Sequence, residues 1–439
     1  MCYDNEMLKR LQPKKIPFKK TVFENGLTLL SERLGQFRSL SMGVWVKTGT
    51  RHETVGVMGV SHFLEHMLFK GTKTRTALDI AREVDQVGGE FNAFTTREIT
   101  CFHLLLLDRD YRLGLDILTD VLLNSDFQKE EFERERRVIL QEISMVEESP
   151  EELAHDLFYE LVYPEHGLGR PILGTQKSIK QMKREEVVQF FHNYYRPDQL
   201  VISVAGDIVH DTLVKSLSRF GRKPWPGRAQ MFQKPPVMAA APSLQMGTWW
   251  VERQTEQVHL IWGVPGPHYA SQDRFAAFLL NVYLGGGMSS ALFQEIREKN
   301  GLAYTVYSNL SPFIDTGIFS IYVATGMAQV LLCLKLIEES VQKIQENPLS
   351  KKDLKVIQDN LKGTIFLSAD SVEARMSSIA KNEIFLNRYF SVEEVCRQID
   401  AVTPLDLQRL AKTLFRDKRR SILALGPKPS RRVAAQFEV

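Results

Sequence analysis

One short segment, residues 60–69, constrains the possible fold more than any other, because it is strongly apolar and yet carries two histidines and a glutamate. Residues three and four apart project from one side of a helix, so His62, Glu65 and His66 are expected on one face of a buried helix. Polar groups left unpaired in such a place cost roughly 1–3 kcal/mol each. We therefore predict a metal centre with His62 and His66 as ligands. The alternative is a chance pattern of core histidines with ordinary hydrogen-bond partners.

A further candidate ligand lies on the long helix predicted over Gln128–Met145. Apolar residues recur on this segment at helical spacing, and Glu135 and Glu142 fall on the same stripe. Because glutamate is almost never buried unless it is paired or binds a metal, two acids on an apolar face need partners. We predict Glu142 as the third metal ligand and Glu135 as a carboxylate that orients a histidine ring. The alternative partners are three nearby arginines: Arg134, Arg136 and Arg137.

The set His62-x-x-Glu65-His66, followed along the chain by Glu142, resembles the pitrilysin family of inverzincin metallopeptidases. The surrounding sequence, His-Phe-Leu-Glu-His-Met-Leu-Phe-Lys-Gly-Thr, is most similar to the branch that includes the catalytic subunit of the mitochondrial processing peptidase and its bacterial relatives. The resemblance implies one Zn2+ per chain, with Glu65 as the base that activates a water molecule. Three protein ligands leave an open position, as a catalytic zinc site requires, whereas a structural site is normally closed by four.

Residues 88–100 extend this resemblance, because they contain the family's Gly-x-x-Asn-Ala pattern. The pattern implies that Asn92 and Ala93 hold the substrate backbone beside the metal. A strand is predicted at Phe91–Thr95, and an extended peptide is expected to add to its edge.

Residues 284–307 match another block of the family, from Leu-Gly-Gly-Gly-Met-Ser-Ser to Gly-Leu-Ala-Tyr. The resemblance implies that Arg297 and Tyr304 contact the substrate carbonyl from the second half of the chain. Donors there would stabilise the oxyanion if the two halves close on each other.

The chain has 439 residues, too many for one ordinary core, so at least two domains are expected. Prolines and an alanine run interrupt every periodic pattern between Gly221 and Met246. We predict a first domain at 1–225, a linker at 226–246 and a second domain at 247–439. Both halves open with strands and continue into helices, which indicates an α+β fold of two duplicated α/β-roll domains, each a mostly antiparallel sheet packed against helices. The strand segments are Gly26–Glu32, Ser41–Thr48, Trp249–Val251 and His259–Val264.

The second domain is expected to lack the metal site. Shifting the long helix forward by 222 positions keeps its apolar stripe but places Glu135 on Ile357 and Glu142 on Thr364. The second half also contains no His-x-x-Glu-His. This domain should therefore only help to hold substrate.

Composition narrows the remaining choices. The formal net charge is +3, which gives no basic field that suggests nucleic acid. No stretch reaches the roughly 18 apolar residues of a membrane span, and the first residues resemble neither a signal peptide nor a transit peptide. The expected location is the cytoplasm of a bacterium, with the mitochondrial matrix as the less favoured choice. Four scattered cysteines predict buried thiols in a reducing compartment: Cys2, Cys101, Cys333 and Cys396.

These patterns together predict a zinc-dependent endopeptidase that cleaves unfolded peptides, presequence-like or oligopeptide, inside a closed chamber. The alternative is a non-catalytic subunit that binds peptides or serves as the structural partner of an active chain in a processing peptidase complex. The resemblance implies a chamber of four such domains, and this chain supplies two. A second chain is therefore expected, most simply an identical one, with a heterodimer as the other possibility.

Overall fold

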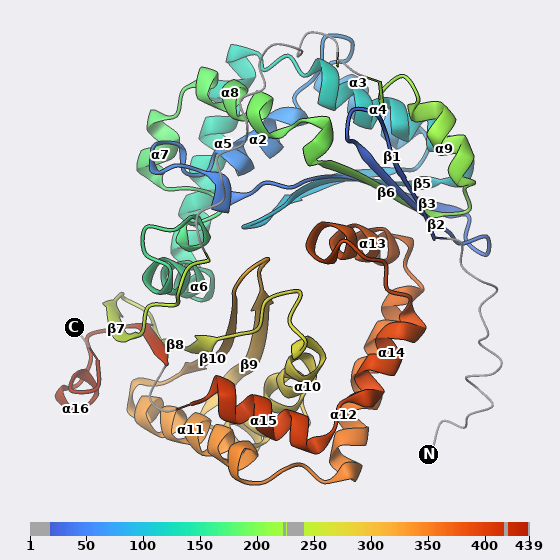
Figure 1. The fold of residues 1–439 in the computed structure, drawn as a ribbon. Coiled ribbons are helices and arrows are strands. Elements are labelled where there is room, and N and C mark those ends of the chain that lie inside the picture. The colour runs from blue at the N-terminus through green and yellow to red at the C-terminus, as the bar shows by residue number, and fades with distance from the viewer. Residues whose placement is uncertain (1–17, 223–224, 226–240, 417–419, 438–439) are drawn as a thin grey trace.

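The computed structural model describes residues 18–222, 225, 241–416 and 420–437. It contains two sheets, each with a layer of helices on its outer side, whose inner faces look toward each other (Figure 1). The linker predicted at 226–246 falls largely outside the described residues, so the domain boundaries stay a prediction.

The first sheet has six strands in the order β1-β2-β6-β3-β5-β4. Neighbouring strands run antiparallel, except that β2 and β6 run parallel. Strand β4 therefore lies at one edge of the sheet. The strands are β1 (Phe18–Val22), β2 (Thr28–Arg33), β3 (Ser39–Val46), β4 (Glu90–Thr95), β5 (Thr100–Leu107) and β6 (Leu200–Gly206).

The second sheet repeats this scheme with five strands in the order β7-β11-β8-β10-β9. Its last strand, β11, runs parallel to β7 and antiparallel to β8, as β6 does with β2 and β3 in the first sheet. Strand β9 takes the edge position that β4 holds in the first sheet. The strands are β7 (Gly247–Glu252), β8 (Val258–Pro265), β9 (Ala303–Pro312), β10 (Gly317–Thr325) and β11 (Ser421–Gly426).

Helices cover the sheets and bury apolar stripes against them. Those of the first half are α2 (Val60–Leu68), α3 (Ala77–Gln86), α4 (Tyr111–Asn124), α5 (Lys129–Glu148), α6 (Pro150–Val162), α7 (Gln176–Gln181), α8 (Arg184–Tyr194) and α9 (His210–Leu217). Those of the second half are α10 (Arg274–Gly285), α11 (Val330–Glu346), α12 (Lys351–Ala369), α13 (Val372–Leu386), α14 (Val392–Ala401), α15 (Pro404–Leu414) and α16 (Arg431–Ala434).

Two helices are exchanged between the halves, because each packs on the sheet of the other half instead of its own. Helix α6 packs on the inner face of the five-stranded sheet, whereas α13 packs on the inner face of the six-stranded sheet (Figure 1). Phe158 of α6 lies against Gly263 in β8, and Met376 of α13 lies against Gly43 in β3. A β-carbon would approach these side chains to 2.5 Å at Gly263 and 2.7 Å at Gly43, so both glycines make room for the exchanged helix. Each contact belongs to a buried apolar cluster that joins the two halves.

The duplicated α+β architecture is confirmed, and the predicted strands correspond to β2, β3, β7 and β8 with ends that differ by one or two residues. The helix predicted at Gln128–Met145 is α5. Its counterpart in the second half is α12, which has Ile357 and Thr364 at the positions of Glu135 and Glu142 in α5. Strand β1 was not predicted from the sequence. Cys2 lies outside the described residues. The other cysteines are buried and form no disulfide bond: Cys101, Cys333 and Cys396.

Candidate metal centre

The start of α2 is fixed by its surroundings. Gly59 precedes the helix with φ of 87°, and a β-carbon there would lie 2.6 Å from the carbonyl oxygen of Leu173. The carboxylate of Glu53 accepts hydrogen bonds from the backbone N–H groups of Gly59 (2.8 Å) and Ser61 (2.9 Å), which have no partner within the helix. Burial raises the pKa of Glu53 to about 7, although these two donors act in the opposite direction.

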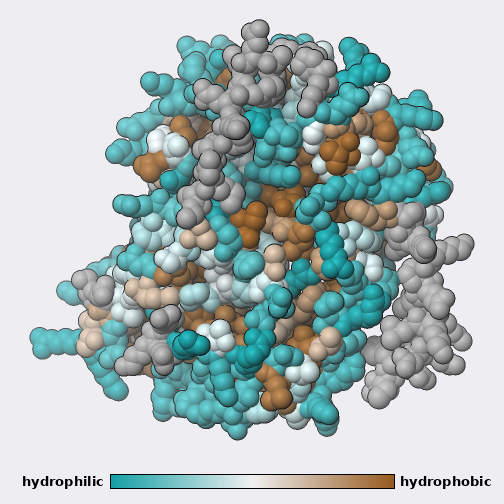
Figure 2. Space-filling model, viewed as in Figure 1, coloured by the Kyte–Doolittle hydropathy of each residue, from teal (hydrophilic) through white to brown (hydrophobic). Residues whose placement is uncertain are grey.

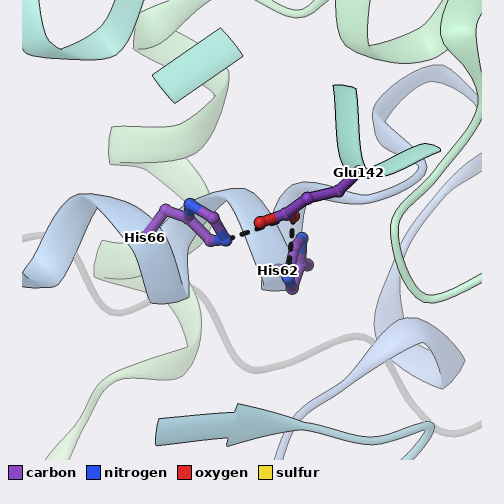
Figure 3. Close-up of side chains that lie close together, drawn as sticks. All are labelled: His62, His66 and Glu142. Carbon is purple, nitrogen blue, oxygen red and sulfur yellow. Dashed lines mark ion pairs between the residues drawn. The ribbon is translucent and has the colours of Figure 1, made fainter. Parts of the chain in front are cut away.

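The packing of α2 on α5 brings three side chains together. Phe63 and Phe132 stack between the helices with ring centroids 4.6 Å apart. Beside them, Oε2 of Glu142 lies 3.5 Å from Nε2 of His66 and 3.8 Å from Nε2 of His62 (Figure 3). One donor atom from each of the three residues falls within 4.8 Å of the others. Over the described ranges, this is the one group of His, Cys, Asp and Glu side chains close enough to hold a metal ion.

The three side chains fit a metal better than they fit one another. Separations of 3.5 and 3.8 Å are too long for good hydrogen bonds, and Oε2 of Glu142 is buried without a hydrogen-bond partner. Two ligands of a tetrahedral zinc ion lie about 3.3–3.6 Å apart, as metal–ligand distances of about 2.0–2.2 Å require. Burial, and after it the neighbouring His66, lowers the pKa of His62 to about 3, so this ring stays neutral, as a ligand must be.

Glu135 lies behind His66. One of its oxygens is 2.9 Å from Nδ1 of His66, and the other accepts a hydrogen bond from Nζ of Lys70 at 2.9 Å. Burial acts to raise the pKa of Glu135, but the bonds with His66 and Lys70 outweigh it, so the pKa is lowered. A carboxylate at Nδ1 keeps the proton there and leaves Nε2 free to bind a metal. Two of the alternative arginines pair with other acids: Arg134 with Glu131 and Arg136 with Glu133.

Glu65 projects from the same helix between the two histidines. Thr95, the last residue of β4, donates a hydrogen bond to Oε2 of Glu65 at 2.5 Å. Burial raises the pKa of Glu65, and the bond from Thr95 opposes that effect. Thr95 was not singled out in the sequence, because its partner lies thirty positions away and the spacing of the motif gives no sign of it.

Asn92 and Ala93 lie in the edge strand β4, which runs beside α2. The side-chain oxygen of Asn92 accepts the backbone N–H of Ala93 at 2.8 Å. Both residues are thus placed where an added peptide strand would pass, and their role in holding it stays a prediction.

Arg297 and Tyr304 contact each other. The guanidinium of Arg297 lies 4.4 Å from the centroid of the Tyr304 ring and donates a hydrogen bond to the Tyr304 carbonyl oxygen at 2.9 Å. The Tyr304 side chain is 76% exposed. It stands near the start of β9, and the same strand contacts the first half through Tyr307, whose hydroxyl lies 2.8 Å from both Glu151 and His155 of α6. No hydrogen bond or ion pair within the described residues joins this pair to His62, Glu65, His66 or Glu142.

The duplicated fold and the site of two histidines and a glutamate are typical of a class of metallopeptidases, and comparison with known proteins identifies the family. Residues 29–176 match the insulinase family of peptidases (family M16), and residues 181–361 match the peptidase M16 inactive domain. The chain belongs to peptidase family M16.

The relatives of the chain support a peptidase role. An uncharacterised zinc protease of Bacillus subtilis is 37% identical over 398 residues, which cover 90% of this chain and 95% of that protein. An uncharacterised zinc protease of Streptomyces coelicolor is 36% identical over 416 residues, which cover 93% of this chain and 89% of that protein.

Two solved structures share the fold. A protease from Helicobacter pylori superposes with a TM-score of 0.85 at 22% identity, covering 94% of this chain and 99% of that one. A peptidase M16 inactive domain from Pseudomonas fluorescens gives a TM-score of 0.83 at 20% identity, covering 94% of this chain and 98% of that one.

In the described part of this chain, no helix is both long and apolar enough to span a membrane.

Proposed function

We propose that this chain is a zinc-dependent endopeptidase in which His62, His66 and Glu142 hold the ion and Glu65 is the general base. One observation carries the proposal: a buried carboxylate oxygen without a hydrogen-bond partner lies between two imidazole nitrogens, on the face of α2 that also bears Glu65. Bound zinc would lower the pKa of a water molecule to about 7 and polarise the scissile carbonyl. Glu65 takes the proton of the attacking water and passes it to the leaving amine.

The substrates are unfolded peptides, presequence-like or oligopeptide, inside a closed chamber. Strand β4 lies at the sheet edge, beside the helix that carries Glu65, so an extended peptide can pair with its backbone. Asn92 and Ala93 hold that backbone. Pairing of this kind depends mainly on main-chain hydrogen bonds, which favours extended chains over folded proteins.

The active form is a dimer, most simply of two identical chains, in the bacterial cytoplasm. Arg297 and Tyr304 supply donors to the oxyanion when the two halves close on each other, in the site of their own chain or across the dimer. Tyr304 is largely exposed, and Tyr307 on the same strand lies against Glu151 and His155 of the first half, so the exposed ring is open both to its own chain and to a second one.

Hydrolysis is tested with an unstructured basic peptide of about 20 residues, the length of a presequence. The wild-type protein should cleave it, a chelator should stop cleavage, and Glu65→Gln should keep zinc but lose activity by a factor of about 1,000 or more. Glu147→Gln, which changes an exposed glutamate of α5, should match the wild type. If wild-type chains that contain zinc leave the peptide intact, the proposal fails in favour of a peptide-binding subunit.

The chain on which Tyr304 acts is tested by mixing two inactive variants, Glu65→Gln and Tyr304→Phe. If Tyr304 acts on the second chain, each mixed dimer contains one intact site, and activity returns on mixing. If Tyr304 acts within its own chain, both sites of the mixed dimer are defective and the mixture stays inactive.

A further inference from the structure

A buried arginine joins the turns of two hairpins, one from each half of the chain. Arg51 lies in the short 3-10 turn Thr50–His52, and its side chain is 2% exposed. Its guanidinium donates to Glu98 in the β4–β5 turn at 2.8 Å and to both carboxylate oxygens of Asp315 in the β9–β10 turn. The backbone N–H of Ile314 also reaches Glu98, at 3.2 Å from each carboxylate oxygen.

The β4–β5 turn ends beside the candidate catalytic base. The backbone N–H of Arg51 donates to the carbonyl oxygen of Arg97, and Thr96 and Ile99 close the turn by a backbone hydrogen bond. The residue before this turn is Thr95, which donates to Glu65 at 2.5 Å. Contacts between neighbouring groups therefore lead from Asp315, in the half whose described residues form no metal site, to Glu65.

The charges make this connection stiff. A guanidinium in a dry place needs carboxylates on its donors, and removing one partner leaves an uncompensated buried charge. Arg51 meets Glu98 from its own half and Asp315 from the other half. The β4–β5 turn therefore cannot shift without either breaking the pair with Arg51 or moving the β9–β10 turn as well.

We infer that Arg51 is a positioning residue for the proposed peptidase reaction. Together with Asp315 it holds the β4–β5 turn so that Thr95 fixes the orientation of the Glu65 carboxylate. The second half, in which no group of metal ligands is found among the described residues, thereby contributes to the geometry of the site in its own chain. The inference rests on the role proposed for Glu65.

The test compares Arg51→Lys and Asp315→Asn with a matched control, Arg375→Lys. Arg375 also joins the halves through a buried pair, with Glu32 of β2, but it does not touch either hairpin turn. We expect kcat to fall about ten- to hundredfold in Arg51→Lys and by a smaller factor in Asp315→Asn, with KM and zinc content unchanged. Arg375→Lys should lose thermal stability but keep kcat.

Hydrogen exchange of the segment 91–100 gives a second measurement that does not depend on activity. Exchange there should become faster in Asp315→Asn and stay as in the wild type in Arg375→Lys. If exchange follows this pattern but the wild-type protein cleaves no peptide, the proposed function fails, whereas the link from Asp315 to the β4–β5 turn stands. The inference is overturned if segment 91–100 exchanges at the wild-type rate in both Arg51→Lys and Asp315→Asn. It is also overturned if Arg375→Lys lowers kcat as much as these two variants do.

Discussion

Glu135 touches no substrate in the proposed reaction, yet its carboxylate decides how His66 is presented. Glu135→Ala removes the group that holds the proton on Nδ1 and leaves Lys70 without its partner. We expect zinc affinity to fall about ten- to hundredfold, measured by competition with a chelator. Glu147→Ala, on the exposed face of the same helix, is the control and should bind zinc as the wild type does. Equal affinity in the two variants would contradict this role for Glu135.

Glu53 gives the stability of the protein a distinctive pH dependence. Its pKa is raised by burial from 4.5 to about 7, so the folded state binds its proton more tightly than the unfolded state does. The stability that results is fully present below pH 4.5 and is lost as the pH rises through about 7. Relative to Glu53→Gln, the wild type should lose about 1–3 kcal/mol of unfolding free energy between pH 5 and pH 8.

Denaturant titrations at several pH values measure this difference. Glu147→Gln provides the control: the difference between its unfolding free energy and that of the wild type should not change with pH. A flat difference for Glu53→Gln as well would show that the carboxyl does not carry a raised pKa in the folded protein.

At the scale of single elements, helix α2 depends strongly on Gly59, the residue that precedes it. Gly59→Ala would force an L-residue to φ of 87° and place its β-carbon 2.6 Å from a backbone oxygen. We expect a loss of about 2–4 kcal/mol in unfolding free energy. Gly56→Ala, in the same loop, meets no atom within 4 Å and should change stability by at most about 0.5 kcal/mol. Similar values for the two variants, from denaturant titration, would contradict the argument.

The positions of the elements could largely be predicted from the sequence because they depend on local pattern. Strand-like segments opened both halves of the sequence, and helical spacing placed His62 and His66 on one face of a helix and Glu142 on the apolar stripe of another. The contacts of Thr95 with Glu65 and of Arg51 with Asp315 could not be predicted in this way. Their partners lie far along the chain, and a threonine at a strand end or an arginine after a strand has many ordinary explanations.

On the scale of the whole molecule, the exchange of α6 and α13 also escaped prediction. The apolar face of an amphipathic helix is the same whichever sheet it covers, so its sequence does not reveal which half it packs against. Figure 2 shows apolar residues in the hollow between the two halves, among a mostly hydrophilic surface. Because each sheet is covered on its inner face by a helix of the other half, the halves depend on each other for stability.

Unfolding of the described body should therefore be a single transition. Phe158→Ala, which empties the place where α6 meets β8, should cost about 3–5 kcal/mol and lower the stability of both sheets together. Leu367→Ala changes an exposed leucine of α12 and should be nearly neutral. Tryptophan fluorescence and circular dichroism should give the same midpoint, and two separate midpoints would show that the halves unfold independently.

The exchange also has a consequence for synthesis on the ribosome. The six-stranded sheet is complete once Gly206 has left the exit tunnel, but α13 begins only at Val372. Until then, the inner face of this sheet has no helix to cover it and presents apolar side chains such as Trp45 to water. We therefore expect a nascent chain of this length to be prone to aggregation unless a chaperone covers its apolar strands, and slower translation between these two points should lengthen that period.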